Sequence, residues 1–325
     1  MSRSTSRILT DSQFSRRRFL HIGAAAFGGA LVPASAMASA GEPAGSALAA
    51  QGAARIATTD LGGATLLQGA GGNVIAMPGA EGALMIDGGL AANADALLAA
   101  VKAATKQSRI HTLINTHGHP EQTGANEAVG RDGGVIFAHE KTRTYLSNSV
   151  YSVTWEGRRP PLPKGARPTK TTRGDGSMEF GGQQIAYGYL PAAHTDGDLY
   201  FHVPKMKLLV AGGVVSAEQW PLIDYRDGAW LGGRVRALER LAAVVEPDTR
   251  VVPADGRMMT GKDIVRHHEM YRELFVTMID YLNKGYGPED AVQRNPLKKY
   301  EAEFGDSSVF TYGALRSMMI AYVPD

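Results

Sequence analysis

Short apolar runs alternate with longer stretches of helical spacing along most of this chain, which limits the folds open to it. Near the start, three apolar runs at 64–67, 73–77 and 83–86 are separated by glycines, as in strands joined by hairpins. An Ala/Leu-rich stretch at 91–105 has helical spacing, and from residue 261 onward the pattern is helical. Further strands are predicted at 110–115, 135–138, 177–180, 184–189, 199–203, 207–211 and 250–252, and further helices at 122–130, 140–146 and 229–245. This alternation predicts an α/β sandwich with mixed sheets. The Pro/Gly-rich stretch 148–176 has no periodicity, and we expect a functional flap or a linker there.

Composition excludes several classes of protein. The chain has 325 residues, of which 44% are hydrophobic and 20% charged, so it is neither fibrous nor fully disordered. The formal net charge of +2 is too small for a strongly basic nucleic-acid-binding protein, and we expect no nucleic-acid partner. The chain has no cysteine, which excludes disulfides, thiolate metal ligands and a cysteine nucleophile. Histidines, carboxylates or carbonyl oxygens must therefore hold any bound metal.

The N-terminus has the features of an export signal. Consecutive arginines at 16–18 precede Phe19 and Leu20, then an apolar stretch at 22–32 and overlapping Ala-x-Ala sites up to residue 40. The apolar stretch is about half as long as a membrane-spanning helix. The segment resembles a twin-arginine signal, which predicts a periplasmic or secreted protein. We expect residues 1–40 to be removed, residues 41–54 to be a flexible lead-in, and no stable membrane anchor to remain.

Two histidine-bearing segments follow predicted strands. His117 and His119 form a His-x-His pair directly after the strand at 110–115, so a loop there would turn both imidazoles toward one point. His194 lies in a second polar segment, which leads into the strand at 199–203. Three histidines brought together by the fold would make a zinc site with one position open to water. A polar turn with histidines two residues apart by chance is the alternative for the first pair.

The order of these motifs resembles the metallo-β-lactamase superfamily, over roughly residues 55–325. Five landmarks carry the resemblance, at 85–89, 115–126, 193–198, 209–213 and 252–256. It implies an αββα sandwich of a metal-dependent hydrolase, with a domain at 55–260 and a helical C-terminal extension at 261–325 packed on it. It also implies that His117, His119 and His194 bind a first metal and that Asp87 orients a ligand histidine.

The sequence departs from the family at the second metal. The family's remaining ligand positions are occupied here by Glu121, Gln122, Gly213 and Asp255. No histidine is left for a second metal, and the bridging carboxylate is replaced by glycine. A neutral amide is a poor zinc ligand, and two carboxylates alone favour a harder cation at lower affinity.

Three hypotheses follow for the site. In the first, one zinc ion on the three histidines activates water, and Glu121 or Asp255 is the general base. In the second, Glu121, Asp255 and Gln122 hold a second, weaker metal. In the third, the site has decayed and the protein is a non-catalytic periplasmic binding protein. The first hypothesis predicts a hydrolase acting on an ester, thioester, lactone or amide bond of a small molecule.

The remaining candidates are given structural roles. Asp198 is expected to hold the His194 loop by turn hydrogen bonds, or to approach the site. His139 is expected to cap or pack, His267 to be solvated, and Trp155, Trp220 and Trp230 to pack loops. The C-terminal extension is not needed for the metal site and is a candidate surface for a homo-oligomer.

Overall fold

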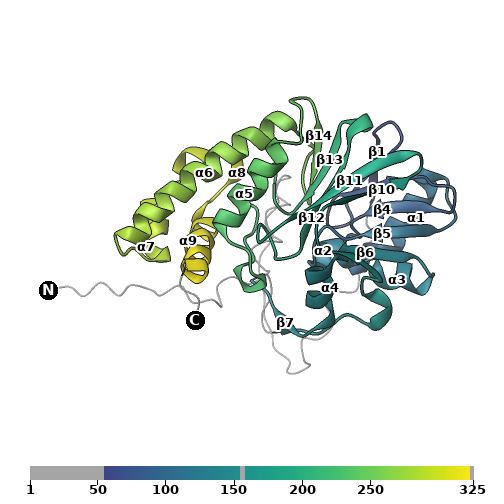
Figure 1. The fold of residues 1–325 in the computed structure, drawn as a ribbon, viewed down its shortest axis with the longest axis horizontal. Helices are drawn as coiled ribbons and strands as arrows, with labels where there is room; N and C mark the ends of the chain where they lie inside the picture. The colour runs from purple at the N-terminus through teal and green to yellow at the C-terminus, as the bar shows by residue number, and fades with distance from the viewer. Residues whose placement is uncertain (1–54, 154–157, 323–325) are drawn as a thin grey trace, which may run out of the picture.

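The computed structural model describes residues 55–153 and 158–322, which form two mixed β-sheets packed face to face with helices on both outer faces (Figure 1). The predictions for residues 1–54 and for Trp155 lie outside the described residues. This αββα sandwich is the predicted fold class. None of the helices in the described residues is long and apolar enough to cross a membrane.

The first sheet has seven strands in the order β1-β2-β3-β4-β5-β6-β9. Its first four strands pair antiparallel, and β4, β5, β6 and β9 pair parallel. The strands are β1 (Ala57–Asp60), β2 (Thr65–Gln68), β3 (Val74–Met77), β4 (Ala83–Ile86), β5 (Ile110–Ile114), β6 (Val135–His139) and β9 (Lys170–Thr172). Strand β9 lies inside the stretch 148–176, where the sequence predicted no regular structure. The cause is that β9 is a three-residue edge strand whose order comes from pairing with β6.

The second sheet has six strands in the order β10-β11-β12-β13-β14-β15, all antiparallel except the β13–β14 pair. The strands are β10 (Gly176–Phe180), β11 (Gln183–Leu190), β12 (Asp198–Val203), β13 (Leu208–Gly212), β14 (Arg250–Pro253) and β15 (Met259–Thr260). A separate hairpin joins β7 (Val150–Tyr151) to β8 (Arg158–Arg159).

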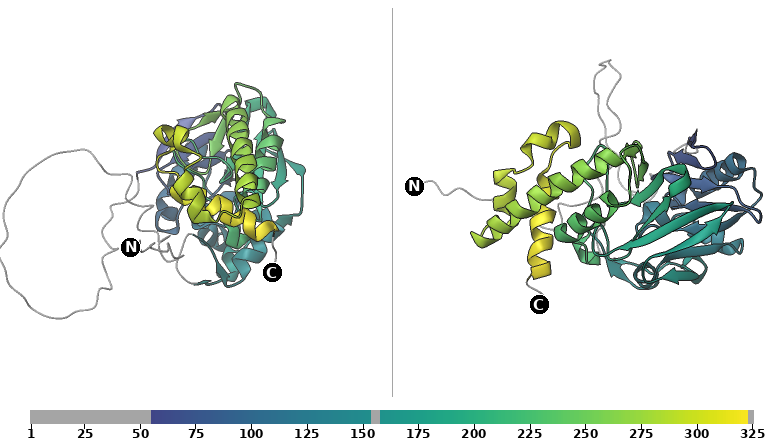
Figure 2. Two further views of the ribbon diagram at one scale, coloured as in Figure 1. Left: turned by 90° about the vertical axis from the view of Figure 1, so that its left-hand side faces the viewer. Right: turned by 45° about the horizontal axis from the view of Figure 1, so that its top comes forward.

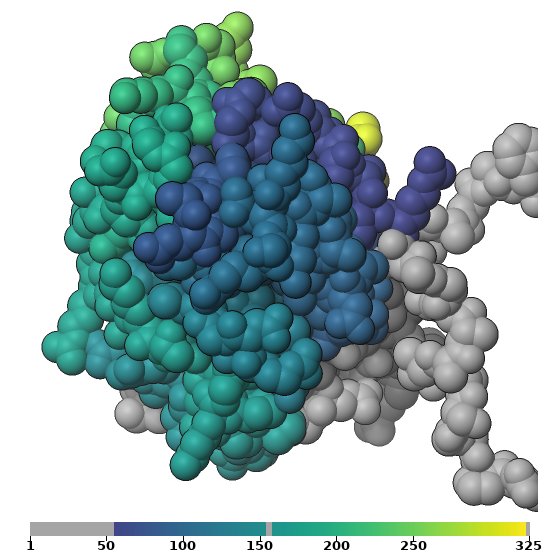
Figure 3. All heavy atoms as spheres, turned by 90° about the vertical axis from the view of Figure 1, so that its right-hand side faces the viewer, coloured from purple at the N-terminus to yellow at the C-terminus, as the bar shows by residue number. Residues whose placement is uncertain are grey.

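The helices form the two outer layers. They are α1 (Ala94–Thr105), α2 (Pro120–Thr123), α3 (Asn126–Arg131), α4 (Glu140–Ser147), α5 (Leu231–Ala242), α6 (Gly261–Asn283), α7 (Pro288–Arg294), α8 (Glu301–Phe304) and α9 (Ser308–Tyr322). Short 3-10 helices occur at Ala91–Asn93, Lys164–Ala166, Pro204–Met206, Tyr225–Asp227 and Lys298–Tyr300. The C-terminal helices cover one face (Figure 2, left), whereas the opposite face is built mainly from the first half of the described chain (Figure 3).

Three buried clusters hold these layers together. One lies between the sheets and joins residues such as Ile86 and Phe201. A second packs α1 on the outer face of the first sheet through Leu97 and Met85. The third contains residues of the second sheet together with residues of α5, α6 and α9, among them Leu209. The C-terminal helices therefore share a core with the sheet whose β11–β12 loop carries His194.

The predicted helix at 122–130 is divided into α2 and α3 around Gly124. A Cβ at this glycine would lie 2.3 Å from the backbone nitrogen of Ala91 and from the carbonyl oxygen of Gly89. The N–H of Gly124 donates to that same carbonyl, 2.9 Å away. The chain that leaves the His-x-His loop is thereby fixed against the loop that follows β4.

Candidate metal centre

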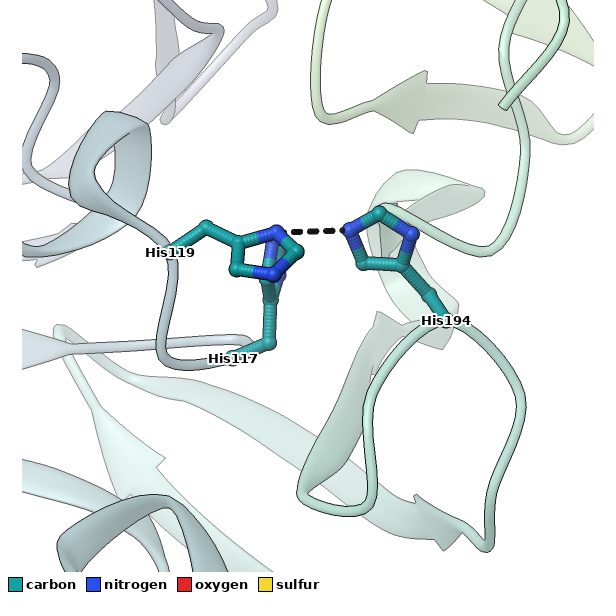
Figure 4. A group of neighbouring side chains, drawn as sticks. All are labelled: His117, His119 and His194. Carbon is teal, nitrogen blue, oxygen red and sulfur yellow. Dashed lines mark hydrogen bonds between the residues drawn. The ribbon is translucent and has the colours of Figure 1, made fainter. Parts of the chain in front are cut away.

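The fold brings the three predicted histidines together at one edge of the sandwich. His117 and His119 lie on the loop between β5 and α2, and His194 lies on the loop between β11 and β12. Their ring centroids are 4.6–4.9 Å apart and their rings are nearly perpendicular (Figure 4). Each ring offers one ligand atom, and these three atoms all lie within 4.8 Å of one another. This spacing fits a single metal ion held by three imidazoles.

Hydrogen bonds on the outer side of two rings fix their tautomers. Nε2 of His119 lies 3.0 Å from the carboxylate of Asp224, which can only accept, so Nε2 carries the proton and Nδ1 is the lone-pair nitrogen. Nδ1 of His194 donates to the carbonyl oxygen of Leu222 at 2.8 Å, which leaves Nε2 as its lone-pair nitrogen. These two inner nitrogens are 3.1 Å apart (Figure 4). Lone pairs this close repel unless a shared cation lies between them, so the donor set fits a metal ion.

His117 is oriented by a two-step relay. The hydroxyl of Thr116 donates to the carboxylate of Asp87 at 2.9–3.0 Å, so its oxygen accepts from Nδ1 of His117, 3.0 Å away. Nε2 of His117 is then the nitrogen that faces the other rings. Burial raises the pKa of Asp87 to about 7, although hydrogen bonds from Thr116 oppose the rise. Asp87 therefore acts on a ligand histidine through Thr116.

All three rings are buried and suited to metal binding. His117, His119 and His194 are 1%, 4% and 6% exposed. Burial, followed by the charges of the neighbouring imidazoles, lowers the pKa of His117 and His194 well below its ordinary value. Arg234 lowers the pKa of His194 further. A neutral imidazole is the form that binds a metal, so the environment keeps these two ligands ready at neutral pH.

Asp198 holds the His194 loop. Its carboxylate accepts from the backbone N–H groups of His194 and Thr195 and from the Thr195 hydroxyl, at 2.7–3.1 Å. With these bonds its oxygens serve the loop and not the ring cluster. Burial raises the pKa of Asp198 to about 6.

The four positions that depart from the family all line the same pocket as the histidines: Glu121, Gln122, Gly213 and Asp255. Asp255 accepts from the hydroxyl of Ser216 at 3.3 Å and from the side-chain amide of Gln219. Burial raises its pKa, and the charges of Glu121 and Glu218 raise it further. In the described part of the chain, the three histidines are the one group with at least three potential metal-ligating side chains at coordinating distance.

The ring of His194 fills the space beside Gly213. A Cβ at Gly213 would lie 2.2 Å from Cδ2 and 2.3 Å from Nε2 of His194. The carboxylate that bridges two metals in the family therefore has no room here while His194 keeps its place. Any side chain at this position would require the ring of His194 to move.

Sequence reasoning missed three residues that support the histidines. Asp224 contacts His119 through its side chain, and its backbone N–H donates to the carbonyl of His194 at 3.0 Å. Its carboxylate also accepts from the hydroxyl of Ser152 at 2.6 Å. Arg159, on the β7–β8 hairpin, donates to the carbonyl of Gly118 at 2.9 Å. Both side chains tie the hairpin region to the metal ligands, and no local motif marks them, because their partners are 41 and 105 residues away.

Arg234 is the third missed residue. It is fully buried in α5, and its guanidinium donates to the carbonyl oxygens of Val214 and Leu222. The Leu222 oxygen is the one that also accepts from His194. These two bonds tie α5 to this wall of the pocket, whereas the buried Nε of Arg234 has no hydrogen-bond partner in the described part of the chain.

The C-terminal extension packs against one wall of the pocket. Trp220 lines the pocket, stacks on Phe310 at 5.2 Å and donates its indole N–H to the carbonyl of Gly305 at 3.0 Å. Trp220 is buried, which agrees with its predicted packing role.

His139 caps α4 by accepting from the N–H of Lys141 at 3.2 Å, as predicted.

The prediction that His267 is solvated is wrong. Its side chain is buried on α6 against Phe304 and Tyr271. The charged neighbours in sequence, Arg266 and Glu269, suggested a solvated face. His267 instead lies on the inner face of this helix, with Ile264 and Met270.

An αββα sandwich with three histidines converging at its edge defines a class of proteins that hold a metal ion between two sheet-edge loops. A family model for the metallo-beta-lactamase superfamily matches residues 68–255. That match covers more than half of the chain, and the chain belongs to this superfamily.

Solved structures agree in fold at low sequence identity. A metallo-beta-lactamase from Pontibacter korlensis is 22% identical, with a TM-score of 0.51 over 67% of this chain and 93% of that one. DIM-1 metallo-beta-lactamase is 15% identical, with a TM-score of 0.53 over 68% and 98%. A double mutant of the sec-alkyl sulfatase PisA1 is 15% identical, with a TM-score of 0.59 over 83% of this chain and 50% of that one. This chain thus spans half of the sulfatase. No curated protein matches it in sequence.

Proposed function

We propose that this protein is a metal-dependent hydrolase that uses one zinc ion on His117, His119 and His194 to cleave an ester, thioester, lactone or amide bond. The observation that carries the proposal is the convergence of three imidazoles, with tautomers set by outer hydrogen bonds, in a pocket that also holds two carboxylates. When bound, zinc on three neutral histidines supplies a Lewis acid and lowers the pKa of a water at its open position toward about 7.

The chain's own residues supply the proton transfer. Glu121 and Asp255 are the carboxylates of the pocket, and we assign the general base to Glu121. Asp255 already accepts hydrogen bonds from Ser216 and Gln219, whereas the Glu121 carboxylate has no hydrogen bond or ion pair with any residue that the structure describes. A carboxylate with free lone pairs can take the proton of the attacking water and return it to the leaving group. Asp255 is the alternative base.

The test is a hydrolase screen on protein loaded with one equivalent of zinc, using a chromogenic ester, a thioester, a lactone and an anilide. We expect metal-dependent turnover of at least one class and its loss in His194→Ala. Glu121→Gln should lower kcat by about 10²-fold or more, whereas the exposed control Glu127→Gln should not. Fully loaded, folded protein that hydrolyses none of the four classes would overturn the proposal in favour of a binding protein.

Export by the twin-arginine route is a separate proposal, supported by the arginines at 16–18, the apolar stretch at 22–32 and the Ala-x-Ala sites. Cell fractionation tests it. We expect the mature chain in the periplasm or medium, and retention of the precursor when Arg17 and Arg18 are both replaced by lysine. Unchanged export of that double variant would contradict this route.

A further inference from the structure

The pocket around the histidines has an uneven distribution of charge. Its charged lining side chains, apart from the histidines, are the acids Glu121 and Asp255. Within the described residues, no lysine or arginine lines it. An anionic group on a substrate would therefore have the bound metal as its one positive partner.

A third carboxylate strengthens this acidic side. Gly256 follows Asp255 in the chain. The carboxylate of Glu218 lies beside Gly256, 3.4 Å from the position that a Cβ on this glycine would take. The charges of Glu121 and Glu218 both act on Asp255, where they raise its pKa. Neither Glu121 nor Asp255 forms an ion pair in the described part of the chain, so no basic side chain there compensates their charge.

Nearby arginines do not neutralise the acids. Arg234 is buried behind His194 and donates to the carbonyls of Val214 and Leu222. Arg257 is exposed and donates to the carbonyl of Met258. An acidic side without a basic partner favours a cationic ligand, in proportion to the desolvation of the pocket.

Part of the pocket wall is apolar. Val215, Trp220, Pro221 and Leu222 line it. Trp220 and Leu222 are held in place, the first by Phe310 and Gly305 and the second by Arg234. This part is therefore a fixed surface against which an alkyl or aryl group can be buried.

The same pocket holds the nitrogen that His117 would offer to the metal. His117 is 1% exposed, lines the pocket, and its inner nitrogen has no hydrogen-bond partner within the described structure. A second metal at the acidic side would have few suitable ligands. The bridging position is closed by the ring of His194 against Gly213, and Gln122 offers a neutral amide.

We propose that the preferred substrates carry both an ammonium group and an apolar group, the ammonium facing Glu121 and Asp255 and the apolar group facing Trp220 and Leu222. This inference rests on the proposed function, because it names the substrate class of the same site. Esters or amides of amino-substituted acids or amines have this form. Anionic substrates, alkyl sulfates included, are selected against.

The test uses probes that are not substrates for hydrolysis at this site and that separate the effect of charge on binding from that of apolar contact. Hexyltrimethylammonium cannot coordinate a metal, 1-hexanol is its uncharged partner, and hexyl sulfate is its anionic partner. Binding of each is measured by calorimetry on zinc-loaded and on metal-free protein. We expect the cation to bind about fivefold or more tightly than the alcohol to metal-free protein, and the sulfate to bind most weakly to that form. In the zinc-loaded form the preference for the cation should be smaller, because the charge of the metal offsets that of the acids. Raising the salt concentration should shrink the preference for the cation.

Variants assign the preference to the acids. Glu121→Gln and Asp255→Asn should each weaken the cation by about fivefold and leave the alcohol unchanged, and the exposed control Glu127→Gln should change neither. Equal binding of cation and alcohol to metal-free protein, or tightest binding of the sulfate to that form, would overturn the inference. Displacement of the cation by a second equivalent of zinc, Mg²⁺ or Ca²⁺ would overturn it too, since the acids would then be metal ligands. Because binding is read without turnover, its failure is distinguishable from failure of the hydrolase proposal.

Discussion

The imidazole of His194 lies against the α-carbon of Gly213, so closely that a Cβ there would be 2.2 Å from Cδ2 of the ring. The ring of His194, a candidate ligand of the first metal, thus occupies the space that a side chain at position 213 would need. The position of the His194 ring and the absence of a carboxylate at position 213 therefore go together.

Replacing Gly213 should damage the remaining metal site. Both Gly213→Ala and Gly213→Asp must push His194 away from His117 and His119, so we expect zinc affinity to fall by about tenfold or more, measured by competition with a chromogenic chelator. Gly313→Ala, in α9 with open space around it, is the matched control and should be neutral or stabilising. Tight binding of two zinc ions by Gly213→Asp would contradict this account.

Asp224 is expected to set the affinity for metal without touching it. Asp224→Asn replaces an acceptor that orients His119 and ties it to Ser152, so zinc should bind about 10–100-fold more weakly. The visible absorption spectrum of the Co²⁺-loaded protein should also change, because the geometry of one ligand is altered. Ser152→Ala should have a smaller effect in the same direction. If Asp224→Asn binds as wild type does, as the exposed control Asp132→Asn should, the orienting role is refuted.

The sandwich and the group of three histidines could be predicted because local motifs mark both and because the order of those motifs resembles the metallo-β-lactamase superfamily. The His-x-His pair follows a buried strand, and His194 lies in a turn between two strands, so strand ends place all three rings. Asp224, Arg159 and Arg234 leave no such pattern. Their roles depend on carbonyls and rings brought close by the tertiary fold, and a buried arginine in a helix cannot be told from an exposed one by its neighbours.

The wrong prediction for His267 has the same cause, because its charged neighbours in the sequence do not show that its own side chain is buried. Its buried side chain has a pKa lowered to about 4 from an ordinary 6.5, first by desolvation and then by Arg266. Between pH 6.5 and pH 4 the unfolded chain binds a proton here that the folded chain does not, so stability is lost as the pH falls through this window. The loss amounts to about 3 kcal/mol at most.

His267→Leu should remove that part of the pH dependence. Asp87 and Asp198, whose pKa values are raised, act in the opposite direction over an overlapping range, so the difference between variant and wild type is the informative quantity. We expect urea unfolding to show the variant gaining stability relative to wild type as the pH falls from 7 to 4.5. A constant difference across this range would show that His267 does not titrate as described.

The C-terminal helices should stabilise both the fold and the pocket wall. Phe310→Ala removes the ring on which Trp220 stacks, so we expect a loss of about 3–5 kcal/mol in the free energy of unfolding, together with weaker binding of apolar ligands. Val276→Ala, at a side chain 61% exposed on α6, should cost less than about 0.5 kcal/mol. Equal effects of the two substitutions would show that Trp220 does not depend on the C-terminal helices.

Metal content tests the central claim most directly. The mature protein, purified without chelators, is analysed by inductively coupled plasma mass spectrometry beside a His117→Ala/His194→Ala double variant whose folding is checked by circular dichroism. The account predicts about one zinc ion per chain in the wild type and none in the folded variant. Wild-type protein that binds no metal, even after reconstitution with excess zinc, would contradict it.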